Sequence, residues 1–406
     1  MADDSGAASA WKRTAWRETT WTRSRRRWRI CLADRIQAPT MRSRRWWKNF
    51  ARAVRSSETN PQTKSVMSIQ TLNPLLAAAA LGWLSLASIW LFALGKTAKA
   101  KWMHRLHALL PVGVLAVAMF SPAGSDVAQL SLHWLLAGAM MLAILTPVWV
   151  LSLVTRNAGA MDVFYSLTAS LTAIGMVLFD GQYSVRQLVF LLMVVIWSAR
   201  LVIHASSTNL GQAQEQQPYA TWRKNNGQRW WWWSYFQVFL LQGGLIWIWA
   251  LTMVMAIGAE PGPLTPLDIF AIAIWLTGFV FQAGADWQLK RFKANPANKG
   301  KVLQSGLWSL TRHPNYFGEA TMWWAYFAFG LAHPLGWLAI VGPLYVTWFM
   351  SKGSAAAMLD RHMLRTKPDY ASYVEHVAGF FPWFKSSADT LMLERFRRRA
   401  PDIPAA

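Results

Sequence analysis

The sequence predicts an all-α fold, a polytopic membrane helix bundle, and three observations lead to this fold class. Of the 406 residues, 54% are hydrophobic, only 15% are charged and 27 are Trp, a composition that is difficult to keep in water. Runs of about 20 mostly apolar residues, the length that crosses a bilayer as a helix, recur from residue 72 onward. Basic residues gather in alternate loops between these runs, as they do in membrane proteins of defined orientation.

The first 66 residues form a basic segment without a sustained apolar period. They carry 16 Lys and Arg against 5 acidic residues, which is typical of a disordered extension. The single cysteine, Cys31, lies here, so a disulfide within the chain is excluded. At Met67 the sequence changes to an apolar run, and we expect the native chain to start there. The alternative is a basic arm that touches anionic lipid or nucleic acid.

The apolar runs predict nine membrane spans in two groups. Two spans within residues 67–125 form an extra N-terminal hairpin, and seven spans within residues 129–385 form the core of the bundle. Residues 386–406 form a basic tail. The predicted spans lie at about 72–95, 105–122, 129–154, 161–179, 186–205, 231–257, 267–289, 315–333 and 335–353.

The basic loops predict how these spans are oriented. Counted from Met67, the loops after the first, third, fifth and seventh spans carry Lys and Arg, whereas the opposite loops carry Asp126, Asp180 and Glu260. Basic loops stay on the cytoplasmic side, so we expect an outside N-terminus and a cytoplasmic C-terminus. These loops and residues 1–66 together account for the net charge of +22, and we therefore expect no nucleic-acid partner.

Ionisable residues occur inside the fourth and fifth predicted spans, where they are costly and mark candidate functional sites. Asp162 opens the fourth span, and Tyr165 lies on the same helical face. Simple capping of the helix by Asp162 is the alternative. Trp197, Arg200 and His204 form one stripe that we expect to face the bundle interior. The alternative for Arg200 is that its side chain extends to the cytoplasmic surface.

A second group of polar residues lies at the end of the seventh predicted span. Asp286, Lys290 and Lys293 share a helical face, and Gln282 lies one turn earlier. Spacing of this kind is also common on a solvated helix, so alone it indicates little about function.

The next segment of the chain, which includes Pro314, adds evidence for a functional site. Pro314 suits the first position of a helix, whose free N–H groups, flanked by Arg312, suit a phosphate group. Asn315 and Glu319 then project from one face of that helix, at i and i+4. We therefore expect the start of this helix to suit a phosphate group.

Three sequence strings carry a family resemblance. FLLQG, ADWQLKRFKANPANKGKV and GLWSLTRHPNYFGEATMWW resemble the steroid 5-alpha-reductase superfamily, most closely its bacterial branch of multispanning proteins. The resemblance covers roughly residues 129–385 and includes the closing PDYASYVEHVAGFFPWF. It implies a seven-helix bundle in a bacterial inner membrane, with NADPH bound from the cytoplasmic side and hydride delivered to a conjugated C=C bond of a lipid-soluble, steroid- or isoprenoid-like substrate.

The resemblance also assigns roles to residues. Asp162 lies close to the position of a catalytic Glu, but Trp197 stands where the catalytic Tyr is expected. Because an indole cannot supply a proton to an enolate, Tyr165 or His204 is the candidate acid beside Asp162. The residues that the resemblance implies for cofactor binding are Gln282, Asp286, Lys293, Arg312, Asn315 and Glu319.

Two other functions stay open. RHPNYFG also resembles membrane methyltransferases that use S-adenosylmethionine, and Trp197 is compatible with a non-catalytic protein that keeps the fold. The eight His residues are scattered, so no metal site is predicted. The expected partners are the lipid bilayer and a hydrophobic small molecule, with no obligate protein partner.

Overall fold

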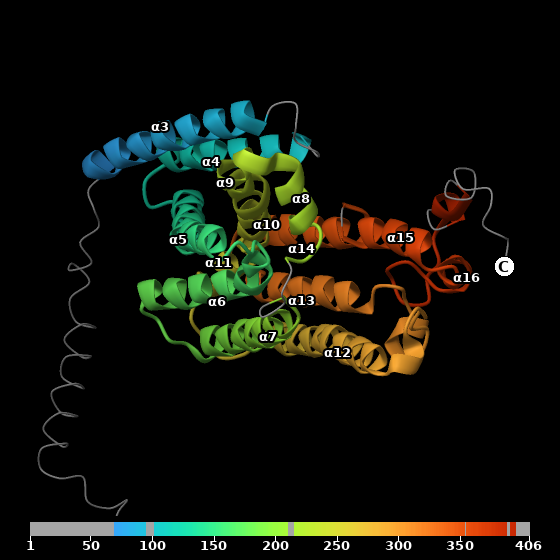
Figure 1. The fold of residues 1–406 in the computed structure, drawn as a ribbon. Coiled ribbons are helices and arrows are strands. Elements are labelled where there is room, and N and C mark those ends of the chain that lie inside the picture. Colours follow the sequence, from blue (N-terminus) through green and yellow to red (C-terminus); the bar gives the residue numbers. More distant parts are fainter. Residues whose placement is uncertain (1–68, 95–100, 210–214, 354, 388–389, 395–406) are drawn as a thin grey trace, which may run out of the picture. The chain divides into compact units, whose positions relative to one another are not determined.

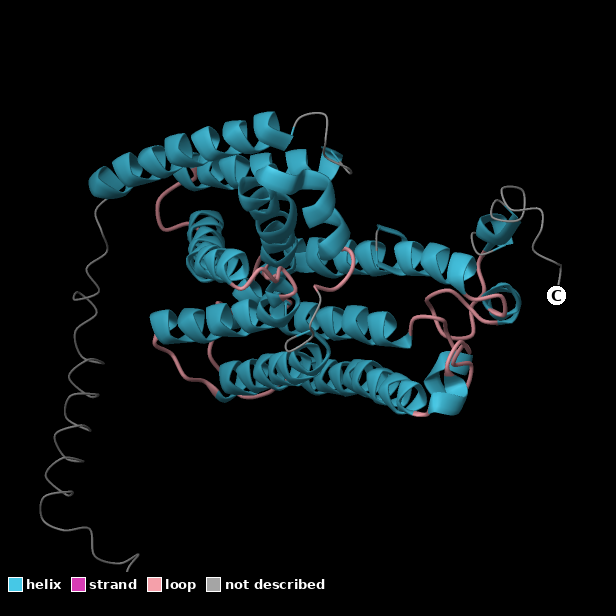
Figure 2. Ribbon diagram, viewed as in Figure 1, coloured by secondary structure: helices cyan, strands magenta, loops and turns pink. Residues whose placement is uncertain are grey.

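A computed structural model describes residues 69–94, 101–209, 215–353, 355–387 and 390–394. These residues form helices and connecting loops, and no strand occurs among them (Figure 1 and Figure 2). The chain is therefore a polytopic helical membrane protein, which confirms the predicted fold class. The expectations for residues 1–66, Cys31 and Met67, and for most of 386–406, lie outside the described residues.

The first five helices pack in sequence order. Each contacts the next one along the chain, because the loops between them are short. Their bounds are α3 (Ile69–Leu94), α4 (Lys101–Phe120), α5 (Asp126–Val154), α6 (Ala160–Asp180) and α7 (Val185–Asn209).

The sixth predicted span, at 231–257, is not one straight helix. A π-helical segment lies in its first half, and the axis turns by 41° around Ala250. A π-helical segment adds a residue to a turn and rotates the faces of the later turns, which apolar composition does not reveal. The elements are α8 (Tyr219–Asn226), η1 (Gly227–Arg229), α9 (Trp230–Ser234), η2 (Tyr235–Leu240), α10 (Leu241–Trp249) and α11 (Leu251–Ile257).

The last elements begin with a long, well-capped helix. Thr265 and Asp268 form a capping box at its start, and Pro266 occupies its first turn. The elements are α12 (Pro266–Ala294), η3 (Pro296–Asn298), η4 (Gly306–Ser309), α13 (Pro314–Gly330), η5 (Gly336–Ile340), α14 (Val341–Trp348), η6 (Phe349–Gly353), α15 (Ala355–Thr366) and α16 (Tyr370–His376).

Fewer helices than the nine predicted spans are long and apolar enough to cross a membrane alone. In the described part of the chain six qualify, and the bent segment of residues 219–257 would make a seventh. The predicted spans at 315–333 and 335–353 correspond to α13, which has 17 residues, and to a broken run around α14. The apolar run continues through the turn at His333, so composition alone overstated the helix length.

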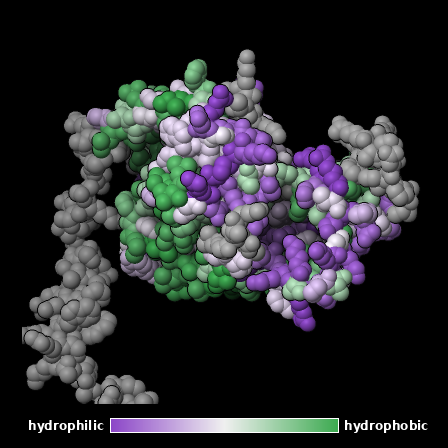
Figure 3. Space-filling view, in the orientation of Figure 1, coloured by the Kyte–Doolittle hydropathy of each residue, from purple (hydrophilic) through white to green (hydrophobic). Residues whose placement is uncertain are grey.

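The surface agrees with a membrane position for the long helices. Figure 3 shows hydrophobic residues gathered over the side that holds α5, α6 and α7, and hydrophilic residues over the side that holds α15 and α16. Large apolar side chains of α5 and α6, such as Val154, Leu178 and Phe179, are exposed. Exposed surface of this kind is stable only against lipid or another apolar partner.

A buried ion pair joins three helices at one end of the bundle. Arg186 of α7 donates from Nε and Nη2 to the Asp268 carboxylate, at 2.8–3.0 Å, and Nη2 also donates to the Phe329 carbonyl of α13. Both side chains are buried, so each charge depends on the other.

Replacing Arg186 by Leu is expected to lower the free energy of unfolding by about 3–5 kcal/mol, because the Asp268 charge would be left buried without its partner. Thermal unfolding of the detergent-purified protein, followed by Trp fluorescence, measures this loss. The matched control is Arg105→Leu, which removes an exposed arginine. Equal melting temperatures for the two variants would contradict the role of the pair.

Candidate functional site

The site depends on how closely α12 and α13 pack. They form the most extensive helix contact in the described structure, and two glycines lie at its centre. A Cβ added to Gly278 would lie 2.7 Å from the Gly318 carbonyl oxygen, and one added to Gly318 would overlap the backbone of α12. Only glycine allows this approach. Polar side chains on the next turns of both helices therefore face one another.

Glu319 of α13 lies at the inner end of this interface, 2% exposed. Its carboxylate accepts hydrogen bonds from Trp197 Nε1 at 2.9 Å and from Trp323 Nε1 at 2.9 Å. The Gln282 side-chain amide also donates to it. Three donors from three helices thus compensate a buried acid.

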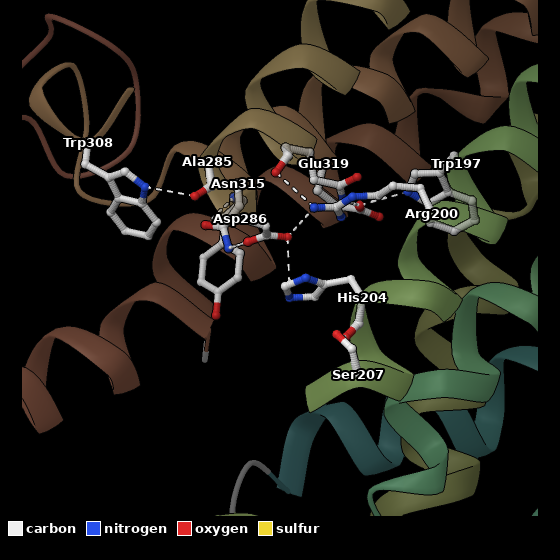
Figure 4. Close-up of polar contacts among 11 residues, drawn as sticks. Trp197, Arg200, His204, Ser207, Ala285, Asp286, Trp308, Asn315 and Glu319 are labelled. Carbon is white, nitrogen blue, oxygen red and sulfur yellow. Dashed lines mark hydrogen bonds and ion pairs between the residues drawn. The ribbon is translucent and has the colours of Figure 1, made fainter. Parts of the chain in front are cut away.

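Asp286 forms the outer half of the same cluster, as Figure 4 shows. Its carboxylate is paired with Arg200 of α7 and accepts a hydrogen bond from Asn315 Nδ2 at 3.0 Å. Arg200 also donates to the Gln282 carbonyl at 3.0 Å. His204 Nε2 lies 3.7 Å from the Asp286 carboxylate. Arg200 therefore faces the bundle interior, and the alternative that it extends to the surface is wrong.

Two buried atoms of the cluster keep hydrogen-bonding capacity. Arg200 Nη1, a donor, and Gln282 Oε1, an acceptor, have no hydrogen-bond partner among the described residues. Lys290 and Lys293 lie on the exposed turns of α12 beyond Asp286, within electrostatic range of His204. The cluster thus offers a donor, an acceptor and nearby positive charge, which fits a nucleotide that carries an amide and phosphates.

The predicted catalytic residues lie on the α6 side of this interior. Asp162 accepts a hydrogen bond from Tyr219 Oη at 2.6 Å, and Gln242 Nε2 donates to the same phenol oxygen at 3.4 Å. Asp162 lies in the first turn of α6, whose N-cap residue is Gly159, so a role of its carboxylate at the start of this helix stays open as the alternative. The ring of Tyr165 packs edge-on against Trp197, 6.2 Å between centroids. Tyr165 therefore contacts the Glu319 cluster through Trp197, whereas Asp162 is bound to Tyr219.

Tyr219 is the residue that sequence reasoning missed. It is buried at the start of α8, a short polar helix whose other residues are exposed or half-buried. A lone tyrosine before a polar helix carries no motif. The only indication in the sequence was a large aromatic residue at the start of a segment whose polar composition is typical of a solvent-exposed helix.

Arg312 lies in a different cluster from the other predicted cofactor residues. Its Nη2 donates to Asp360 at 3.1 Å and its Nη1 to the Val377 carbonyl at 2.7 Å. His313 Nε2 lies 2.8 Å from the other Asp360 oxygen, to which Tyr370 also donates. This cluster fastens the segment after α14 to the start of α13. A role for Arg312 in cofactor binding stays a prediction.

Asp360 lies outside the membrane-spanning helices, and its surroundings favour the charged carboxylate. Burial raises the pKa of this carboxyl, but the hydrogen bond with His313 and the charge of Arg312 outweigh burial and lower the pKa to about 2. The carboxylate is therefore charged at neutral pH and holds both partners.

Comparisons with known proteins agree on part of the chain. The model of a family described as a protein of unknown function, DUF1295, matches residues 148–377. Delta(14)-sterol reductase of Ascobolus immersus is 32% identical over 105 residues, which are 22% of this chain and 24% of that protein. Delta(14)-sterol reductase erg24 of Schizosaccharomyces pombe is 32% identical over 130 residues, 27% of this chain and 31% of that protein.

A third similarity is to an enzyme of another class. Probable O-methyltransferase ustE of Ustilaginoidea virens is 45% identical over 58 residues, which are 14% of this chain and 19% of that protein. The chain thus spans less than a third of the length of each of these three relatives.

Asp360→Asn is expected to lower the free energy of unfolding at neutral pH by about 2 kcal/mol. The pKa of Asp360 is lower in the folded than in the unfolded protein, so its contribution is complete above about pH 4 and is lost as the pH falls toward 2. Melting temperatures measured across this range should therefore fall less steeply for the variant. Asp369→Asn, at an exposed carboxyl nearby, is the control, and parallel curves for Asp360→Asn and wild type would contradict this account.

Proposed function

The chain belongs to the DUF1295 family of the steroid 5-alpha-reductase-like superfamily, and we propose that it is a membrane-embedded, NADPH-dependent reductase of a C=C bond in a lipid-soluble, sterol- or isoprenoid-like substrate. The observation that carries this proposal is the buried cluster of Asp286, Asn315 and Glu319 with Arg200. The likeness to two sterol reductases supports the substrate class and a role in lipid metabolism.

The cluster has the donor set that NADPH needs. Arg200 Nη1 and Gln282 Oε1 are buried without a hydrogen-bond partner among the described residues, which leaves a donor and an acceptor for a ligand amide, and Asn315 binds Asp286 from α13. Lys290 and Lys293 supply positive charge toward the nucleotide phosphates. Bound NADPH supplies a hydride, which is the chemistry that none of the side chains provides.

The chain's own residues handle the proton and the substrate carbonyl. Trp197 is committed to Glu319 and cannot act as an acid. The hydrogen-bonded pair of Asp162 and Tyr219 is buried nearby, and in the structure the single phenol proton of Tyr219 is donated to Asp162. When Asp162 carries a proton, it donates that proton to the phenol oxygen, and Tyr219 passes its own proton to the substrate oxygen that gains negative charge. This leaves the Asp162 carboxylate and restores the phenol. We assign the proton to this pair, with Tyr165 and His204 as the other candidates.

Aromatic side chains keep water out of this interior. Trp197, Trp323 and Tyr326 are fully buried and pack edge-on against one another around Glu319. A dry site strengthens each electrostatic contact with the reacting atoms and protects a hydride donor from side reactions.

The basic residues near the proposed cofactor site support an orientation of the protein in the membrane. The cofactor end of the site continues into the basic turns around Lys290 and Lys293, which the distribution of charge assigns to the cytoplasm. The C-terminus is then cytoplasmic as well, in a bacterial inner membrane.

A methyltransferase that uses S-adenosylmethionine is the second candidate, because the chain resembles an O-methyltransferase over a short segment. A non-catalytic protein that keeps the fold is the third. Thermal stabilisation of the purified protein by NADPH, by S-adenosylmethionine or by neither separates the three.

Asp286→Ala and Asn315→Ala are each expected to weaken NADPH binding at least tenfold, about 1.4 kcal/mol, because each removes a polar group that orients Arg200 or the ligand. Titration of intrinsic Trp fluorescence with NADPH measures the dissociation constants. Asn225→Ala changes an exposed asparagine and serves as the control. Unchanged NADPH affinity in both site variants would refute the cofactor assignment.

Asp162→Asn and Tyr219→Phe are expected to lower the rate of NADPH oxidation with a steroid-like enone by roughly 10²–10⁴-fold, the usual contribution of general acid catalysis. NADPH affinity should stay within a factor of about three, since neither residue belongs to the cofactor cluster. Tyr183→Phe, at an exposed tyrosine, is the control. If instead Tyr165→Phe or His204→Ala alone abolishes turnover, the proton belongs to that residue.

A further inference from the structure

The extra N-terminal hairpin forms one wall of a pocket. Helices α3 and α4 precede the family-matched residues 148–377; α4 packs against α5 and α10, and α3 packs against α4 and η2. Figure 1 shows α3 and α4 side by side along one edge of these helices. Between the four helices lies a hollow of about 360 Å³, which we call the hairpin pocket.

Small residues create the hollow, and close contacts fix its walls. A Cβ on Gly244 of α10 would lie 2.9 Å from His107 Nδ1, and one on Gly243 would lie 2.8 Å from Leu145. Helices α4 and α5 therefore touch α10 at its glycines. A Cβ on Gly138 of α5 would likewise lie 2.9 Å from Trp247 Nε1, and the hollow lies beside these contacts, next to Ala139.

The side chains that line the pocket are mostly apolar. Three Trp residues line it, and each indole N–H is already bound: Trp83 to the Ala108 carbonyl at 2.8 Å, Trp90 to His104 at 3.1 Å, and Trp247 to the Trp134 carbonyl at 2.7 Å. The other lining residues are mainly Leu, Ala and Gly. Of the His107 ring nitrogens, Nε2 lies 3.1 Å from Tyr345 Oη, and Nδ1 has no hydrogen-bond partner among the described residues. The lining thus offers a ligand few polar groups.

The mouth of the pocket lies on the flank of membrane-spanning helices. Ala79 of α3 and Ala139 of α5 are exposed at its rim, and Leu136 and Leu142 are half-exposed. In a bilayer this flank meets hydrocarbon. The pocket thus opens to lipid chains and not to water.

We propose that the hairpin pocket holds an acyl chain of a bilayer phospholipid, which packs between the hairpin and the core as part of the folded protein. An empty apolar hollow of this size deprives its lining of dispersion contacts and destabilises the fold. A flexible hydrocarbon chain can enter from the flank and fill it. The lining includes none of Asp162, Asp286 and Glu319, so the occupant is separate from the substrate of the proposed reductase.

Native mass spectrometry of the full chain released from a mild detergent tests the proposal. The wild type should carry a bound phospholipid. Ala139→Phe fills the pocket and should reduce the number of bound phospholipids by one, whereas Ala143→Phe, at an exposed position of α5 outside the pocket, should not. After removal of lipid, dioleoylphosphatidylethanolamine should raise the melting temperature of the wild type and of Ala143→Phe, but not of Ala139→Phe.

A second measurement uses the wild type and does not depend on how well the variant folds. A phosphatidylethanolamine with a diazirine in one acyl chain should cross-link to peptides from 74–94 and 132–145, the pocket walls. Cross-links confined to other helices, or an unchanged lipid count in a folded Ala139→Phe variant, would overturn the proposal.

Discussion

The structure depends on the close approach of α12 and α13 at Gly278 and Gly318. With the two backbones this near, the neighbouring turns must place Asp286 opposite Asn315, and Gln282 beside Glu319. Two carboxylates then lie in a bundle interior where an unpaired charge is not tolerated. Their partners come from a third helix, α7, whose arginine and indole close the cluster from the opposite side. Helix packing and charge compensation thus specify one arrangement together.

Trp197 determines which residues of the interior can supply a proton. Its indole donates to Glu319 and packs against Trp323 and Tyr326, so it stabilises the buried acid without bringing a titratable proton of its own. A phenol is present elsewhere, on Tyr219, where it is bound to Asp162. The interior therefore keeps a hydrogen-bonded acid pair although its position in the sequence differs from the family pattern.

Local sequence predicted what depends on local spacing. Apolar runs indicated the helices, and the i, i+4 spacing of Asn315 and Glu319 placed them on one face. Contacts between distant segments were not predictable: nothing near Tyr219 or Asp360 in the sequence announces its partner. Arg312 was assigned from its neighbours in the chain, yet its guanidinium reaches residues that lie 48 and 65 positions later. Helix breaks were missed because apolar composition does not encode backbone geometry.

The cluster of Arg312, His313 and Asp360 also has a consequence for how the protein is made. The start of α13 binds residues up to Val377 and Ala378, which leave the ribosome several seconds later at usual rates of synthesis. Until those residues arrive, Arg312 lacks these partners, and the loop that leads into α13 has no fixed end. Assembly of the membrane helices can therefore precede the binding of this loop by Asp360 and Val377, and a chain that stops short of this segment would hold its helices in the membrane while the start of α13 lacks these contacts.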